Sequence, residues 1–164
     1  MLRNENLIPL SHQHQRALAL CVRIDRAQPI PASDLLAWQV EIEREFDQEI
    51  KFHFAAEEAV IFPEARQFAE LIPLVDELIS EHDLLRESFA QASTRCMSAE
   101  MLLIFAQRLS AHIRKEERVL FEDMQQLMNS VELADIGVRL EAALKDATQS
   151  CVLTNEATKL KGKR

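Results

Sequence analysis

The chain has 164 residues, a hydrophobic content of 48% and a formal net charge of −8. This length suits one domain with a sizeable core, and the acidic balance argues against general binding of nucleic acids or anionic membranes, which requires a basic surface. Only 2 glycines and 5 prolines are present, which argues against a sheet-rich fold with many turns and favours a few long helices.

The first half of the chain predicts two long helices. Helical periodicity covers residues 11–27, and a proline-containing segment then breaks it. Ser33 or Asp34 can cap a second helix. This helix is expected to continue to about Phe62, where Pro63 should stop or kink it.

The second half of the chain predicts two further long helices and a shorter one. A third helix is expected over residues 73–93, because the proline at its start is favourable in a first turn. Ser98 can cap a fourth helix that continues to about Met128. Ser130 can cap a shorter fifth helix that ends near Thr148.

These elements predict an all-α fold. Four long amphipathic helices with short connections favour an antiparallel up-down-up-down four-helix bundle, with the additional C-terminal helix packed on its outside. We place this domain at residues 1–150 and expect a loose C-terminal tail at residues 151–164, whose basic end we interpret as a solvated terminus.

The three cysteines are widely spaced and include no CxxC pair. They therefore indicate neither a disulfide framework nor a zinc or iron–sulfur motif. The sequence shows no signal-peptide pattern and no apolar run of the roughly 20 residues that a membrane span needs. We expect a soluble, cytoplasmic protein.

One internal repeat carries the chemistry of this sequence. Residues 53–62 and 112–121 both follow the pattern HxxxEExV[IL]F, and the helix before each repeat carries His14 or His82. On a helix, the histidine and the first glutamate of each repeat fall within a stripe of Phe, Ile, Leu and Val side chains. The chain therefore resembles a helical hairpin used twice, with polar groups directed at the core.

Height along the predicted bundle gives an independent test of this convergence. Two residues of an antiparallel hairpin lie level when their sequence midpoint falls on the turn. The midpoint of His82 and His112 is Met97, inside the predicted break before Ser98. Two further pairs give the same result, so six groups are expected to meet at one level: His14, His53, Glu57, His82, His112 and Glu116.

This set of side chains favours a metal centre. Burial of a bare carboxylate is costly unless it is paired or bound to a cation, and no basic residue lies on the inner stripes. Six nitrogen and oxygen ligands exceed the needs of one tetrahedral zinc ion. Two HxxxE pairs suit two ions, with Glu57 and Glu116 able to bridge them. The donor set favours iron over calcium or magnesium, with manganese or zinc as alternatives.

The glutamates one position further on, Glu58 and Glu117, have a different predicted role. Helical phase places them about 100° away from Glu57 and Glu116, so we expect them to face solvent. An auxiliary ligand role for either is the alternative.

These motifs resemble those of the hemerythrin-like, or HHE cation-binding, domains. The resemblance covers about residues 7–128 and rests on the ordered set His, HxxxE, His, HxxxE. It implies a non-haem di-iron centre, two iron ions bridged by an oxygen species. It also implies four terminal histidine ligands and two bridging glutamates, which here are His14, His53, His82 and His112 with Glu57 and Glu116.

The sequence departs from the oxygen-carrying hemerythrins at two places. Those proteins have two histidines one turn apart on the third helix, whereas the residues one turn from His82 are Leu78 and Arg86. They close the final motif with an aspartate, where this chain has Glu116. With one ligand fewer, one iron is expected to be more open to solvent.

The function we expect is that of a binding protein whose di-iron centre engages a small ligand such as oxygen, nitric oxide or peroxide. The alternative is a di-iron enzyme that consumes peroxide or nitric oxide, or an oxidase or iron-handling domain. No separate acid–base pair or nucleophile is indicated, and the chain has no Tyr for a tyrosyl radical, which favours binding over catalysis. A third hypothesis, a structural or interaction bundle, predicts no bound metal. The sequence does not identify a protein partner.

Overall fold

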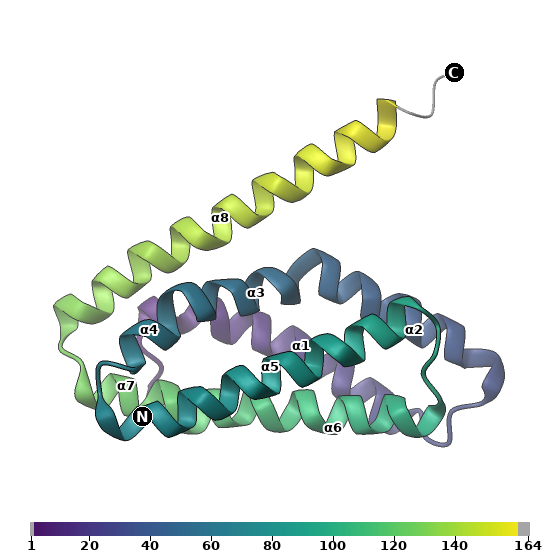
Figure 1. Ribbon diagram of the computed structural model, residues 1–164, viewed down its shortest axis with the longest axis horizontal. Helices are drawn as coiled ribbons and strands as arrows, with labels where there is room; N and C mark the ends of the chain where they lie inside the picture. The colour runs from purple at the N-terminus through teal and green to yellow at the C-terminus, as the bar shows by residue number, and fades with distance from the viewer. Residues whose placement is uncertain (1, 161–164) are drawn as a thin grey trace.

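The computed structural model describes the backbone of residues 2–160 and the side chains of residues 2–145. All of the regular secondary structure in these residues is helical. Four helical rods run side by side, and a fifth helix leaves the bundle at an angle (Figure 1). The fold is the predicted antiparallel four-helix bundle with an additional C-terminal helix.

The first rod begins earlier than the sequence pattern indicated. A 3-10 turn, η1 (Glu5–Leu7), leads directly into α1 (Ile8–Arg26). The side chain of Asn4 caps η1 by accepting a hydrogen bond from the backbone N–H of Asn6 at 3.0 Å. Pro9 lies in the first turn of α1, where its missing N–H costs no hydrogen bond.

The second rod is a continuous run of five helical segments after the 3-10 turn η2 (Ala32–Asp34). These are α2 (Leu35–Glu45), the π-helical η3 (Phe46–Ile50), α3 (Lys51–Ala56), the π-helical η4 (Glu57–Ile61) and α4 (Phe62–Ala65). Pro63 does not stop the helix near Phe62, which is one of the two outcomes predicted for it, since the helix continues through Pro63 to Ala65. The π-helical turn before Pro63 already departs from the i to i−4 hydrogen-bond pattern that proline breaks.

The third and fourth rods agree closely with their predicted bounds. After the 3-10 turn η5 (Ala69–Leu71), α5 covers Ile72–Ser93. The fourth rod comprises α6 (Ala99–Lys115), the π-helical η6 (Glu116–Leu120) and α7 (Phe121–Leu127). The predicted cap is confirmed, because the Ser98 hydroxyl accepts a hydrogen bond from the backbone N–H of Met101 at 3.2 Å.

The C-terminal helix, α8 (Ser130–Leu160), is longer than predicted and has a different cap. Asn129 rather than Ser130 provides the cap, because its side-chain oxygen accepts hydrogen bonds from the backbone N–H groups of Val131 and Glu132 at 2.9 and 3.1 Å. The helix passes the predicted end near Thr148. The predicted loose tail at 151–164 stays a prediction, because its side chains and its last four residues lie outside the described part of the chain.

The apolar core consists of two clusters, one on each side of the level at which the buried histidines and glutamates lie. The first cluster includes Leu7 and Leu10 near the N-terminus, Phe62 and Phe121 from the second and fourth rods, and Leu140 from the C-terminal helix. The second cluster lies toward the other end of the bundle and includes Leu20, Ile42, Phe54, Phe89 and Phe105. Three buried side chains anchor the first half of α8 on the bundle: Leu133, Ile136 and Leu140.

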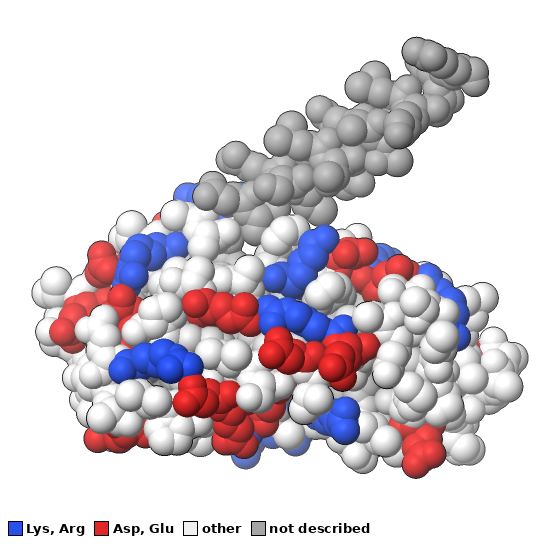
Figure 2. All heavy atoms as spheres, in the orientation of Figure 1, with Lys and Arg blue, Asp and Glu red and all other residues white. Residues whose placement is uncertain are grey.

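The charged side chains of opposite sign are interspersed on the face that Figure 2 shows, with no separate acidic and basic halves. Several form ion pairs between neighbouring rods, such as Arg23 with Glu41 and Lys115 with Glu77. Among the described residues, no helix combines the length and apolarity needed to cross a membrane.

Candidate metal centre

All six predicted ligands are buried at the middle of the bundle, and they come from all of its rods. None exposes more than 4% of its surface. They are His14 on α1, His53 on α3, Glu57 at the start of η4, His82 on α5, His112 on α6 and Glu116 at the start of η6.

These side chains form two overlapping groups of four. In each group, one ligand atom from every residue lies within 4.8 Å of the others. His14 and His53 belong to one group and His82 and His112 to the other, and both groups include Glu57 and Glu116. The arrangement therefore offers two neighbouring cation positions with shared carboxylates.

Each of the two carboxylates points one oxygen toward one group of four and its other oxygen toward the other group. Oε1 of Glu57 lies 3.1 Å from Nε2 of His53, and its Oε2 lies 3.4 Å from Nε2 of His82. An ion with bonds of about 2.1 Å brings neighbouring ligand atoms to about 3.0–3.4 Å. The separations at Glu57 therefore match those of ligands around a common ion.

Glu116 repeats this geometry on the opposite rod. Its Oε2 lies 3.1 Å from Nε2 of His14, and its Oε1 lies 3.3 Å from Nε2 of His112. The HxxxE spacing explains the second contact, because residues four apart on a helix lie on the same face. The two repeats thus supply equivalent halves of the centre, as their sequence similarity predicted.

Several of these buried atoms make no hydrogen bond within the described structure. They are both carboxylate oxygens of Glu57 and of Glu116, and Nε2 of His82 and of His112. Buried polar atoms are normally satisfied, so a convergent set of unsatisfied ones needs an explanation. A cation bound between them provides it, and oxygen and imidazole nitrogen are suitable donors for one.

The other ring nitrogen, Nδ1, of every histidine is occupied by a side-chain oxygen. Because carboxylate and amide oxygens only accept, each Nδ1 donates, which leaves each Nε2 as the atom that could bind an ion. The pairs are His14 with Glu117 at 2.7 Å, His53 with Gln13 at 2.8 Å, His82 with Glu58 at 2.8 Å and His112 with Glu81 at 2.9 Å. Nε2 of His14 and Nε2 of His53 lie 2.8 Å apart and share a hydrogen bond.

The solvent-facing position predicted for Glu58 and Glu117 is only half right. Their side chains expose 32% and 23% of their surface, and each binds a histidine of a neighbouring helix. Sequence reasoning missed this role, and it also missed Gln13 and Glu81. The available signal was their position directly beside a predicted ligand, which places a side chain on the flank that faces the next helix.

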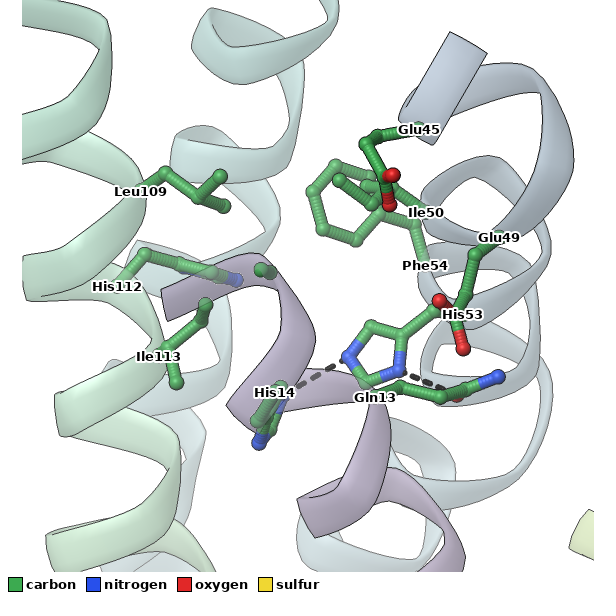
Figure 3. A pocket seen from close by; sticks show the side chains of 11 residues that line it. Gln13, His14, Glu45, Glu49, Ile50, His53, Phe54, Leu109, His112 and Ile113 are labelled. Carbon is green, nitrogen blue, oxygen red and sulfur yellow. Dashed lines mark hydrogen bonds between the residues drawn. The ribbon is translucent and has the colours of Figure 1, made fainter. Parts of the chain in front are cut away.

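Three of these outer partners are themselves bound by a cation. Arg3 donates to Glu117 at 2.7 Å and Arg86 donates to Glu58 at 2.7 Å, and Lys115 forms a close ion pair with Glu81. His53 differs, because its partner Gln13 is a neutral amide (Figure 3). Nε2 of each of the four histidines therefore lies near a buried carboxylate, whereas the partners at Nδ1, and the cations that bind those partners, differ.

Without a bound cation, protons balance the two buried carboxylates. Burial lowers the pKa of His112, but Glu116 and Glu81 outweigh burial and raise that pKa to about 10. Burial and the charge of Glu57 raise the pKa of Glu116, but His112 and His14 outweigh them and bring it to about 2. Imidazolium groups therefore face carboxylates, and a metal ion that replaces these protons would release them on binding.

The same balance holds at the other pair. Burial lowers the pKa of His14, but its contacts with the carboxylates of Glu116 and Glu117 outweigh burial and raise the pKa well above the usual value. Burial raises the pKa of Glu57, but His53 and His14 outweigh it, so the pKa of Glu57 lies well below the usual value.

A small cavity of about 10 Å³ adjoins the histidines (Figure 3). This volume is about the minimum that holds one water molecule. Polar walls come from His14, His53 and His112, apolar walls from Ala17, Ile50, Phe54, Leu109 and Ile113, and the remaining lining residues are Gln13, Glu45 and Glu49. The cavity therefore suits a small species at the edge of the candidate centre.

Comparison with known proteins agrees with the geometry. The model of the hemerythrin HHE cation binding domain matches residues 9–149, which cover most of the chain and all six predicted ligands. Comparison with curated proteins and with solved structures found no match.

Proposed function

Because the chain belongs to the hemerythrin HHE cation-binding domain family, we propose that its six buried histidines and glutamates hold a pair of iron ions that engages a small ligand. The observation that carries this proposal is the pair of overlapping four-residue groups that share both carboxylates. One ion would use the two histidines of each group, and Glu57 and Glu116 would bind both ions.

The donor set supports iron as the metal. It combines imidazole nitrogen with carboxylate oxygen and contains no thiolate, which suits iron, with manganese and zinc as competitors. Four protein atoms per ion leave coordination positions free for a small molecule or solvent. Two adjacent iron ions would supply electrons and open coordination positions to such a ligand.

The protein's own residues would restrict what reaches the centre. Ile50, Phe54, Leu109 and Ile113 line the cavity with apolar surface and limit the water beside the histidines. A cavity of about 10 Å³ is too small for an organic substrate, which agrees with a ligand of only a few atoms. This supports a role in binding or sensing such a ligand.

Metal analysis tests the proposed centre. We expect two equivalents of iron per chain after anaerobic loading with Fe²⁺ and removal of free metal. Oxidised protein should then show near-ultraviolet absorption in proportion to its iron. Loading in the presence of equal Mn²⁺ or Zn²⁺ tests the choice of metal. Stoichiometric zinc alone, or no retained metal, would contradict the proposal.

Ligand titration tests the second half of the proposal. We expect nitric oxide or peroxide to change the absorption spectrum of the iron-loaded protein with saturation at a fixed ratio to protein. Apo-protein under the same conditions is the control. Sustained turnover of peroxide or nitric oxide over many equivalents would instead identify the di-iron enzyme alternative.

A further inference from the structure

The N-terminal segment reaches the candidate centre through one arginine. Arg3 Nη2 donates to Oε2 of Glu117 at 2.7 Å and also contacts the backbone carbonyl of Glu117. Oε1 of the same carboxylate accepts from Nδ1 of His14 at 2.7 Å. The Arg3 and Glu117 side chains expose only 18% and 23% of their surface, so water screens this ion pair less than a fully exposed one.

A second contact connects Arg3 to the face of the same imidazole. The Arg3 guanidinium lies 5.2 Å from the ring centroid of Phe121, within the range of cation–π attraction. Phe121 in turn stacks on His14, with centroids 5.8 Å apart and ring planes 18° from parallel. Arg3 therefore supports two of the groups that orient the His14 ring, Glu117 at Nδ1 and Phe121 on the ring face; His53 contacts the ring at Nε2.

Gln125 on α7 holds this segment in place. Its side-chain oxygen accepts from Arg3 Nη1 at 3.2 Å and from the backbone N–H of Asn4 at 2.8 Å. Its side-chain nitrogen donates to the carbonyl of Leu2 at 3.2 Å. One side chain thus fixes three successive residues of the segment.

The C-terminal helix packs closely against the same N-terminal segment at Gly137. A Cβ at this position would lie 2.2 Å from Oδ1 and 2.9 Å from Cβ of Asn6, closer than packed atoms allow. Asn6 is not free to move aside, because its backbone and side-chain nitrogens both donate to Oδ1 of Asn4, at 3.0 and 2.9 Å. Glycine therefore permits α8 to lie directly against the residues that follow Arg3.

The corresponding cations at the other two histidines have a different origin. Arg86, which binds Glu58, belongs to α5, and Lys115, which binds Glu81, belongs to α6. Both cations are part of the bundle rods themselves. Among these three cations, only Arg3 comes from a segment outside the rods, and that segment is bound by α8.

We propose that Arg3 is a positioning residue for the iron ion held by His14 and His53, and that α8 keeps Arg3 in place. This inference rests on the proposed two-iron function. It has a thermodynamic corollary, because α8 and this ion act on the same segment and so stabilise each other reciprocally. The binding strength of one iron is thereby connected to the packing of the two chain ends.

Release of iron tests the role of Arg3. Full-length protein is loaded anaerobically with Fe²⁺ and then mixed with a chromophoric ferrous chelator. In Arg3→Gln we expect one of the two equivalents to leave about 10-fold faster than in the wild type, the scale typical for loss of an outer-shell partner. The second equivalent should be unchanged, and Arg3→Lys should restore most of the slow release. Arg66→Gln, which removes an exposed ion pair with Asp76, is the matched control.

The outcomes separate this inference from the proposed function. A wild type that retains fewer than two equivalents would overturn both. A wild type that retains two, with unchanged release in Arg3→Gln, would overturn the role of Arg3 alone. Equal acceleration of both equivalents would also overturn it, because it would indicate a general structural role in place of positioning at one ion.

A distant substitution tests the part played by α8. Gly137→Ala should accelerate release of the same single equivalent, although Gly137 touches none of the six ligands. Val138→Ala is the matched control, because it also places alanine in α8 at a side chain that is 69% exposed. Equal release rates in Gly137→Ala and Val138→Ala would overturn the role of α8.

Discussion

The two ends of the candidate metal centre have matching inner ligands but different support. At the end formed by His82 and His112, each imidazole donates to a carboxylate, and each carboxylate is bound by a cation from a bundle helix. Helix packing alone therefore fixes this end. The partners described for these two imidazoles and their carboxylates all lie on the four rods.

The end formed by His14 and His53 is supported less uniformly. His53 donates to a neutral amide from Gln13, and His14 depends on a carboxylate whose cation comes from the N-terminal segment. A sequence repeat can therefore produce equivalent candidate ligands without producing equivalent surroundings for them. In the proposed function, the inner residues would hold both ions, and the outer residues would distinguish one ion from the other.

Removal of a shared carboxylate should have the largest effect, because it removes a ligand from both ends of the centre at once. Glu57 belongs to both groups of potential ligands, so Glu57→Ala should lose both ions in dialysed protein analysed for iron. Glu58→Ala, the neighbouring control, should weaken only one ion, by about 10- to 100-fold. Retention of one tightly bound ion by Glu57→Ala would show that this carboxylate is not shared.

A smaller effect is expected when the weaker end is made to resemble the stronger one. Gln13→Glu places an anionic acceptor at Nδ1 of His53, which raises the basicity of the imidazole. We expect about 10-fold slower release of one iron to a chelator. The matched control is Gln15→Glu, an exposed position on the same helix. Equal behaviour of the two variants would mean that the neutral partner does not distinguish the ends.

The smallest effect is expected in metal-free protein, where protons on the histidines balance the negative charge of the buried glutamates. The pKa of His112 is raised from 6.5 to about 10, so its contribution to stability is complete below pH 6.5 and is lost as the pH rises toward 10. The pKa of Glu116 is lowered from 4.5 to about 2, so its contribution is complete above pH 4.5 and is lost as the pH falls toward 2.

Thermal unfolding of metal-free protein measures this balance. The midpoint should be highest between about pH 4.5 and 6.5 and should fall by several degrees toward pH 9. His112→Gln should flatten that alkaline slope, whereas His12→Gln, at an exposed position, should leave it unchanged. A midpoint that rises from pH 6.5 to 9 would contradict the raised pKa of His112.

The rods and the convergence of six groups were predictable because both follow from helical phase. Histidines and glutamates within apolar stripes, with midpoints on the predicted turns, restrict where these side chains can lie. Helix ends were less predictable. Pro63 normally ends a helix, but the π-helical turn η4 before it carries the rod onward to Ala65. Asn129 and Ser130 are adjacent and both suit a cap, so only the structure distinguishes them.

The outer partners could not be predicted because they depend on how neighbouring helices are rotated and how far side chains reach across them. Helical phase places Glu117 on a flank, but it does not show that His14 of another rod lies 2.7 Å away. Arg3 belongs to no periodic pattern, since it precedes the first helix. Its contact with Glu117 follows from the path of a short segment that Gln125 and α8 hold.

The division of the apolar core into two clusters has a consequence for cooperativity. Between the clusters lies a layer of charged and hydrogen-bonded groups, which cannot supply the continuous apolar packing that joins most cores. Without metal, the two halves of the bundle should open as separate units and show different amide hydrogen-exchange protection. Iron ions bound to all four rods would act as cross-links across this layer. Loading should therefore merge the two halves into one unit whose slowest amides exchange together.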